Sequence, residues 1–151
     1  MADEYPSKTL RPARILLVED NPDDVDLVRR ALQRGHVDNP ITVIGDGRQA
    51  FELLVREANR LDRPPFDLLL LDLTLPGLDG RVLLQEIQAD KRLRRMPALV
   101  LTGSAREEDW ISAYKSGAVA FLRKPFDLER FLATIGDLYG YRIVIVKEDV
   151  S

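Results

Sequence analysis

Charged and polar side chains follow four of the chain's short apolar runs, and their types are those that bind phosphate and metal ions. They are Glu19 and Asp20 after residues 15–18, Asp72 after 66–71, Thr102 after 98–101, and Lys124 just beyond 119–122. A carboxylate at the end of a buried strand is costly to desolvate unless its charge is used. Parallel α/β sheets bind their ligands in the crevice at the carboxyl ends of their strands. If these runs lie side by side in such a sheet, the polar groups converge on one pocket.

The carboxylates of Glu19, Asp20 and Asp72 would then lie close together. Their mutual repulsion would raise the pKa of one or two of them unless a cation lay between them. Oxygen ligands alone suit Mg²⁺, and an Asp beside Mg²⁺ can act as a nucleophile that forms an acyl phosphate. Lys124 could pair with one phosphoryl oxygen while the Thr102 hydroxyl donates a hydrogen bond to another. The set therefore predicts phosphoryl transfer to Asp72.

Each of these residues has a simpler interpretation when it is taken alone. Glu19 and Asp20 could merely precede a helix, and Lys124 could be a solvated loop charge. Thr102 by itself carries almost no information. Asp72 is more informative, because it ends so apolar a run that its carboxylate would be costly to keep there without a function. Their joint placement at successive strand ends is what favours a functional site.

Apolar patterning and turn residues predict strands that alternate with helices over residues 14–139. The predicted strands are 14–18, 41–44, 66–71, 97–101 and 119–122. The predicted helices lie between 22 and 35, 48 and 58, 80 and 89, 104 and 117, and 128 and 139. Strands that are apolar throughout, rather than alternating, are typical of parallel sheets buried on both faces. The sequence therefore predicts an α/β fold with a doubly wound five-stranded parallel sheet.

Several helix ends carry local signals. Asn21 and Pro22 predict an N-cap and a first helical residue, residues 104–107 have the S-x-x-E form of a capping box, and Asp127 can cap the last helix. The connector at 59–65 is longer than is usual between a helix and a strand. The helical residues predicted to face the core are Leu27, Val28, Ala31 and Leu32, then Phe51, Leu54 and Val55, then Val82, Leu83 and Ile87.

The two ends of the chain differ from the domain at 13–139. Residues 1–12 carry two prolines without apolar periodicity and are expected to form a flexible tail. The extension at 140–151 contains four β-branched residues, 143–146, which predict a strand that is apolar on both faces. Because an unpaired strand of this kind promotes aggregation, we expect it to pair with a second copy in a symmetric homodimer. The alternative is that the extension folds back on the chain's own helices.

Composition narrows the class of protein. With 151 residues, 45% apolar and 31% charged, the chain suits one soluble domain, and its net charge of −3 gives no electrostatic case for a nucleic-acid partner. No apolar run approaches the roughly 18 residues of a membrane helix. The absence of Cys excludes disulfides and thiolate sites. Together these absences lead us to expect a cytoplasmic location.

The lone His36 is expected to be an exposed loop residue rather than a ligand or a phosphohistidine.

Four short motifs together resemble the response-regulator receiver domain, the phosphoacceptor half of bacterial two-component signalling. The motifs are residues 17–21, 71–80, 101–104 and 124–126, and the resemblance spans about 14–139. It implies a flavodoxin-like sheet in the order 2-1-3-4-5. It also implies that Asp72 is phosphorylated by a histidine kinase. Asp20 and Asp72 would bind Mg²⁺ directly, Glu19 would act through water, and the Thr74 backbone carbonyl would be a further ligand.

The resemblance also implies a conformational switch. After phosphorylation the Thr102 hydroxyl would move toward the phosphoryl group, and Phe121 would rotate into the space that it leaves. Phe121 lacks the hydroxyl of the Tyr that is often found there, so any hydrogen bond made by that Tyr would be missing. Gly103 would leave room for a partner's side chain, and a cis Lys124–Pro125 peptide would direct the ammonium inward.

Within the family, the chain is most similar to stand-alone regulators of phytochrome-type histidine kinases. The features are the long connector 59–65, the form of 72–76, and the expected lack of an output domain. Such a protein would signal through protein contacts around its fourth helix, fifth strand and last helix. It would not be an enzyme beyond self-phosphorylation and autodephosphorylation.

Two other functions use related chemistry. A phosphohydrolase of the haloacid dehalogenase type also has an Asp nucleophile with Mg²⁺ and Lys, but it requires a second Asp where this chain has Thr74. Its acidic metal-binding pair also lies late in the chain, whereas Glu19 and Asp20 come early. A flavodoxin-like FMN binder is the weakest alternative, because the acidic turn 19–22 would repel a phosphate.

Overall fold

The computed structural model of the protein describes residues 12–103, 106–138 and 144–146. They form a five-stranded parallel sheet in the order β2-β1-β3-β4-β5. The strands are β1 (Ile15–Val18), β2 (Ile41–Ile44), β3 (Leu68–Leu71), β4 (Ala98–Thr102) and β5 (Ala120–Arg123). The helices are α1 (Pro22–Arg34), α2 (Gly47–Leu61), α3 (Gly80–Ala89), α4 (Glu107–Lys115) and α5 (Leu128–Gly136), with a 3₁₀ turn η3 (Leu93–Arg95). The predicted fold class and strand order are confirmed.

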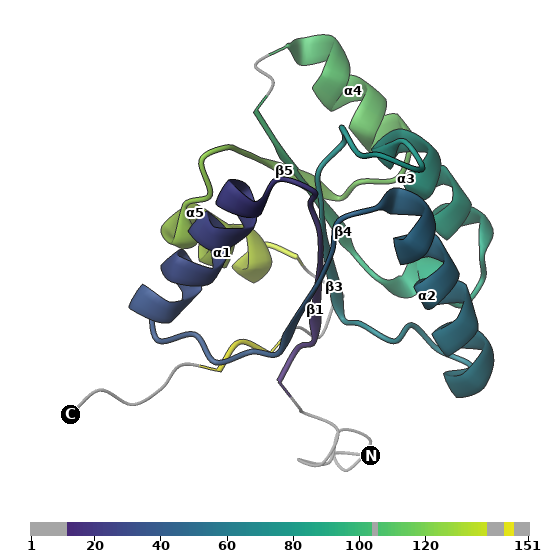
Figure 1. Ribbon diagram of the computed structural model, residues 1–151, viewed down its shortest axis with the longest axis horizontal. Coiled ribbons are helices and arrows are strands. Elements are labelled where there is room, and N and C mark those ends of the chain that lie inside the picture. Colours follow the sequence, from purple (N-terminus) through teal and green to yellow (C-terminus); the bar gives the residue numbers. More distant parts are fainter. Residues whose placement is uncertain (1–11, 104–105, 139–143, 147–151) are drawn as a thin grey trace.

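The sheet is covered on both faces. Helices α1 and α5 pack on one face and α2, α3 and α4 on the other (Figure 1). Every residue of β1, β3 and β4 is buried, which explains why these strands are apolar along their whole length. Val18 lies level with Leu71 in the register of β1 and β3, so these two strands end side by side. The carboxyl edge of the sheet therefore brings together residues far apart in the sequence.

The predicted caps of α1 and α5 are confirmed. The Asn21 side chain accepts a hydrogen bond from the Asp23 N–H (2.9 Å), and Pro22 is the first helical residue. Gly35 follows the last turn of α1, and its N–H donates to a carbonyl of that turn. Asp127 accepts a hydrogen bond from the Arg130 N–H (3.1 Å) at the start of α5. These local signals fix where the helices leave the sheet.

Several predicted boundaries are wrong by two or three residues. Helix α2 continues to Leu61 and ends at Asp62 in the left-handed conformation (φ 56°), so the connector is shorter than predicted. Strand β3 begins at Leu68 rather than 66, because the Asp67 side chain accepts the Arg14 N–H (2.8 Å) before the ladder starts. Helix α5 ends at Gly136, whereas residue 139, its predicted end, lies outside the described residues.

The predicted capping box of α4 is also wrong. The N-cap position is held by Arg106, two residues after Ser104, and Ser104 itself lies outside the described residues. Arg106 has extended dihedrals, and its carbonyl accepts the Asp109 N–H (3.2 Å). Its guanidinium binds the Glu108 carboxylate at 2.7 Å, and its side chain makes no capping hydrogen bond to the helix start.

The residues predicted at the middle of each apolar helix face are buried, whereas some of those predicted at its borders are exposed or only partly buried. Leu27 and Val82 are 45% and 39% exposed, because each lies beside the buried stripe of its helix rather than in it. On the other side of the α3 stripe, Leu84 is fully buried although it was not predicted. The predicted Phe51 and Val55 of α2 are only partly buried.

Residues 144–146, the described part of the extension, form no strand. The Val144 carbonyl accepts the Ala13 N–H (2.8 Å), and the Val146 carbonyl accepts the Asp38 N–H (2.8 Å). Ile145 packs against the core on the α1 and α5 side of the sheet. This part therefore folds back on its own chain, which is the alternative left open by the sequence. Residues 1–11, 139–143 and 147–151 lie outside the described residues, and the homodimer stays a prediction.

Among the described helices, none combines the length and apolar character that a membrane span requires. His36 is exposed, as predicted, in the turn between α1 and β2.

Candidate functional site

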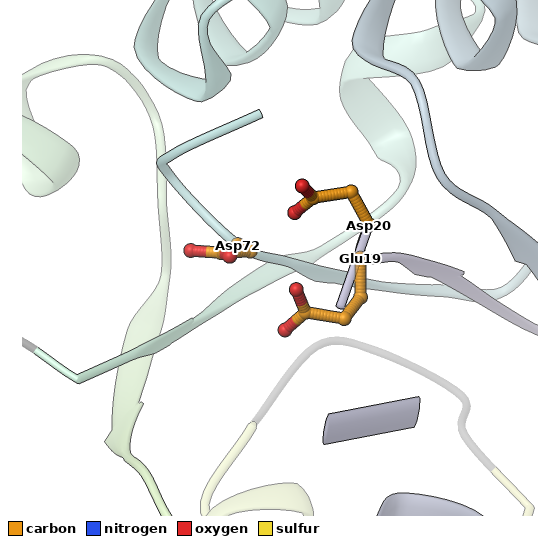
Figure 2. Close-up of side chains that lie close together, drawn as sticks. All are labelled: Glu19, Asp20 and Asp72. Carbon is orange, nitrogen blue, oxygen red and sulfur yellow. The ribbon is translucent and has the colours of Figure 1, made fainter. Parts of the chain in front are cut away.

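Three carboxylates converge where β1 and β3 end (Figure 2). Glu19 and Asp20 follow β1 directly, and Asp72 follows β3. The Asp72 N–H donates to the Val18 carbonyl (3.0 Å), which holds the two strand ends together. Carboxylate oxygens of Glu19, Asp20 and Asp72 all lie within 4.8 Å of one another. The structure thus confirms the predicted proximity of these side chains.

The three carboxylates differ in their exposure to solvent. Glu19 is only 2% exposed, Asp72 is half-buried and Asp20 is exposed. Burial raises the pKa of Glu19, and the negative charge of Asp72 adds to this effect. The Lys124 ammonium and the Asn21 N–H, which lies 3.2 Å from Glu19 Oε2, offset the rise only in part. The raised pKa of Glu19 indicates that the positive charge near the cluster does not balance its negative charges.

Lys124 is the cation that the chain itself supplies to this cluster. Its Nζ lies 2.6 Å from Glu19 Oε1, 2.8 Å from Asp24 Oδ2 and 3.4 Å from Asp72 Oδ2. Burial alone would lower the pKa of Lys124, but its bonds to Asp24 and Glu19 and the charge of Asp72 outweigh burial and raise it. The ammonium therefore stays charged. The Lys124–Pro125 peptide is cis, as the resemblance implied.

Thr102 and Thr74 lie in the segments that border the cluster. Thr102 is the last residue of β4 and is buried, and its carbonyl accepts the Lys124 N–H (2.7 Å). This bond fixes the alignment of the carboxyl ends of β4 and β5. The Thr74 N–H donates to Asp72 Oδ1 (3.2 Å), so the turn after β3 is tied to the central carboxylate. Both residues thus belong to the same edge of the sheet as Asp72.

Phe121 of β5 packs against two aromatic rings of α4. Its ring centroid lies 4.4 Å from that of Trp110 and 4.9 Å from that of Tyr114. A change in the position of Phe121 would therefore be transmitted to α4. A Cβ added at Gly103 would meet no atom within 4 Å, which agrees with the expected open space beside Thr102.

Asp24 is the contact of Lys124 that the sequence interpretation missed. It lies in the acidic first turn of α1, where carboxylates are common because they favour the helix dipole. It is the third residue of α1, a position whose side chain points back past the helix start. An acidic residue at the third helical position, shortly after a strand that ends in acidic residues, is the sequence pattern that could have identified it.

The donor set suits a hard divalent cation. Its oxygens are all carboxylate, and one of them belongs to a buried residue whose ionisation is disfavoured without further positive charge. Mg²⁺ is typically bound by one or two carboxylates together with waters and substrate phosphate. Glu19, Asp20 and Asp72 therefore fit the ion that the sequence predicts.

The chain matches known proteins over most of its length. Residues 15–136 match the model of the response regulator receiver domain. Response regulator Rcp1 of Synechocystis sp. is 37% identical over 118 residues, which cover 78% of this chain and 80% of Rcp1. Nothing in these comparisons supports the phosphohydrolase alternative.

Solved structures show the same relationship. The bacteriophytochrome response regulator AtBRR superposes with a TM-score of 0.75 at 36% identity, covering 91% of this chain and 99% of AtBRR. The receiver domain of sensor histidine kinase PA1611 from Pseudomonas aeruginosa PAO1, with a magnesium ion coordinated in its active site cleft, has a TM-score of 0.66 at 34% identity. That match covers 84% of this chain and 100% of the PA1611 domain. The chain therefore belongs to the response regulator receiver domain family.

Proposed function

We propose that this receiver accepts a phosphoryl group on Asp72 from the phosphohistidine of a histidine kinase, in a Mg²⁺-dependent reaction. The observation that supports this most is the surroundings of Asp72, a carboxylate 13% exposed with an ammonium 3.4 Å away and two further carboxylates within 4.8 Å. An Asp oxygen attacks phosphorus, the bond to the donor nitrogen breaks, and an acyl phosphate results.

Each residue type at the site suits one task in this reaction. Asp20 and Asp72 would hold Mg²⁺ directly, Glu19 would act through water, and the Thr74 backbone carbonyl would be a further ligand. Bound Mg²⁺ supplies neutralisation of the charge on the incoming phosphoryl group. Lys124 pairs with one phosphoryl oxygen, and the Thr102 hydroxyl donates to another.

The output of the receiver is proposed to be a change in its surface around α4, β5 and α5. Phe121 supports this, because its ring lies between the strand that leads to Lys124 and the aromatic residues of α4. A shift of Thr102 toward the phosphoryl group would give Phe121 space to rotate. The packing of Trp110 and Tyr114 would then change, which a partner protein could detect.

The kinase is proposed to be of the phytochrome type. The support is the likeness to AtBRR, which is a bacteriophytochrome response regulator. The homodimer and the cytoplasmic location stay predictions.

The test is phosphotransfer to wild-type protein, Asp72→Asn and Asp38→Asn, with candidate kinases and with acetyl phosphate. Asp38 is an exposed residue just before β2, at the opposite edge of the sheet, so its variant makes the same chemical change away from the site. We expect labelling of wild type and Asp38→Asn and none of Asp72→Asn. Labelling that persists in Asp72→Asn would place the acceptor elsewhere, and turnover of many equivalents of acetyl phosphate would indicate a phosphohydrolase.

A further inference from the structure

We propose that Asp24 is a positioning residue that holds the Lys124 ammonium beside Asp72 for phosphoryl acceptance. This inference rests on the proposed function. Lys124 Nζ is closer to Asp24 Oδ2 (2.8 Å) than to Asp72 Oδ2 (3.4 Å), although Asp72 is the residue that the ammonium must serve. The contact joins residues 100 positions apart, so it ties the start of α1 to the segment after β5.

The Asp24–Lys124 pair is partly withdrawn from solvent. The side chains of Asp24 and Lys124 are 25% and 18% exposed, in contrast to the Arg30–Asp26 pair of the same helix, at 62% and 52%. Exposed pairs are screened by water and contribute little, whereas a partly buried pair is screened less. The Asp24 contact therefore restrains the long lysine side chain more strongly than a surface ion pair would.

Asp24 also differs from the other two anions that contact Lys124. Glu19 and Asp72 belong to the carboxylate group that fits a divalent ion, and Asp24 does not. A cation bound among those carboxylates would neutralise them and weaken their attraction for Lys124. Asp24 would keep its charge and its contact. It is thus the one described anionic partner that holds the ammonium in place in both the metal-free and the metal-bound protein.

The same helix offers a matched control. Asp23 is adjacent in sequence, exposed, and makes no ion pair with Lys124. Asp23→Asn removes the same charge from the first turn of α1 as Asp24→Asn does. Any effect of general electrostatics or of the helix dipole should therefore be similar in the two variants.

The experiment measures phosphorylation by acetyl phosphate at saturating Mg²⁺. It uses wild type, Asp24→Asn, Asp24→Glu, Asp23→Asn, Lys124→Met and the Asp24→Asn/Lys124→Met double variant. We expect Asp24→Asn to lower the limiting rate about three- to tenfold, as for residues coupled by direct contact, and to leave the half-saturating acetyl phosphate concentration within about twofold. Asp24→Glu should restore part of the rate. In the Lys124→Met background, Asp24→Asn should have no further effect.

A second readout does not depend on activity. The unfolding free energies of the four proteins of the Asp24–Lys124 cycle, measured in urea without metal, should be non-additive. The inference is overturned if Asp24→Asn behaves as Asp23→Asn does, or if its rate effect is unchanged in Lys124→Met. Asp72→Asn in the same assay separates the two proposals. If it abolishes labelling while Asp24→Asn has no effect, only the role of Asp24 fails.

Discussion

Asn39 holds the described part of the C-terminal extension against the domain, and its substitution should be costly. The residue lies just before β2 and is only 7% exposed. Its Nδ2 donates to the Ala13 carbonyl (2.9 Å) and to the Val144 carbonyl (2.7 Å), and its Oδ1 accepts the Val146 N–H (2.8 Å). One buried side chain therefore satisfies three backbone groups from two ends of the chain.

The size of the effect follows from these three bonds. A typical protein hydrogen bond contributes about 1 kcal/mol net, so Asn39→Ala should lower the unfolding free energy by about 3 kcal/mol. That is a large part of the roughly 5–15 kcal/mol that stabilises a domain of ordinary size. Only the bond to Ala13 remains when residues 144–151 are deleted. In the shortened chain, the same substitution should therefore cost about 1 kcal/mol.

Equilibrium unfolding in urea measures both numbers in a double-mutant cycle. The four proteins are wild type, Asn39→Ala, the chain ending at residue 143, and the combination of the two. The expected coupling is about 2 kcal/mol. Asp38→Ala is the control, because its backbone N–H to Val146 survives the change and its side chain is exposed. It should change the free energy by less than about 0.5 kcal/mol.

Additivity within about 0.5 kcal/mol would refute the account, because Asn39 would then act independently of the extension. The protein concentration adds a second criterion. Bonds within one chain give the same coupling at every concentration, whereas a coupling that rises with concentration would show that the extension binds a second copy. The latter result would favour the predicted homodimer over the contacts described for residues 144–146.

Gly77 has a φ of 83°, and a Cβ there would collide with the Asp46 carboxylate. Gly77→Ala should therefore cost about 1–3 kcal/mol in urea unfolding, while Gly103→Ala, where a Cβ meets no atom, serves as the tolerated control. Burial raises the pKa of Glu19 above its ordinary 4.5, so the folded metal-free protein binds this proton more tightly than the unfolded chain does. The resulting stability is fully present below pH 4.5 and is lost as the pH rises through the folded pKa. Glu19→Gln should remove this pH dependence of the unfolding free energy, measured in urea at a series of pH values. If the unfolding free energy of Glu19→Gln varied with pH as that of the wild type does, Glu19 would not be its source.

The sheet and the site were predictable because both depend on patterns that are local in sequence. Strands buried on both faces must be apolar throughout, and the polar residue that ends such a run lies at the ligand-binding edge. Asn21 marked the start of α1 in the same local way, since a cap satisfies backbone N–H groups within a few residues. From the strand ends alone, Asp72 and Lys124 were expected to meet, and they do.

Features set by tertiary packing were not predictable from such patterns. Leu27 has the right spacing for the core, but its exposure depends on how α1 is rotated against the sheet. The capping-box pattern at 104–107 is a local signal, but it predicted the wrong start for α4, which has Arg106 as its N-cap. Asp24 is a strong example, because its partner lies 100 residues away and no spacing rule relates the two. Sequence patterns identify the elements and their ends, whereas rotation and side-chain partners come from packing.

The charges at the carboxyl edge favour a cation supplied from outside the chain. Glu19, Asp20 and Asp72 form the cluster, Asp24 borders it, and Lys124 is the one ammonium that the described residues place among them. With every group ionised, four carboxylates face one positive charge, an excess of three negative charges. Burial leaves Glu19 with a raised pKa, so a proton relieves part of this excess in the metal-free protein. A divalent ion would take over that task and release the proton, so its affinity should increase with pH up to the raised pKa of Glu19 and level off above it.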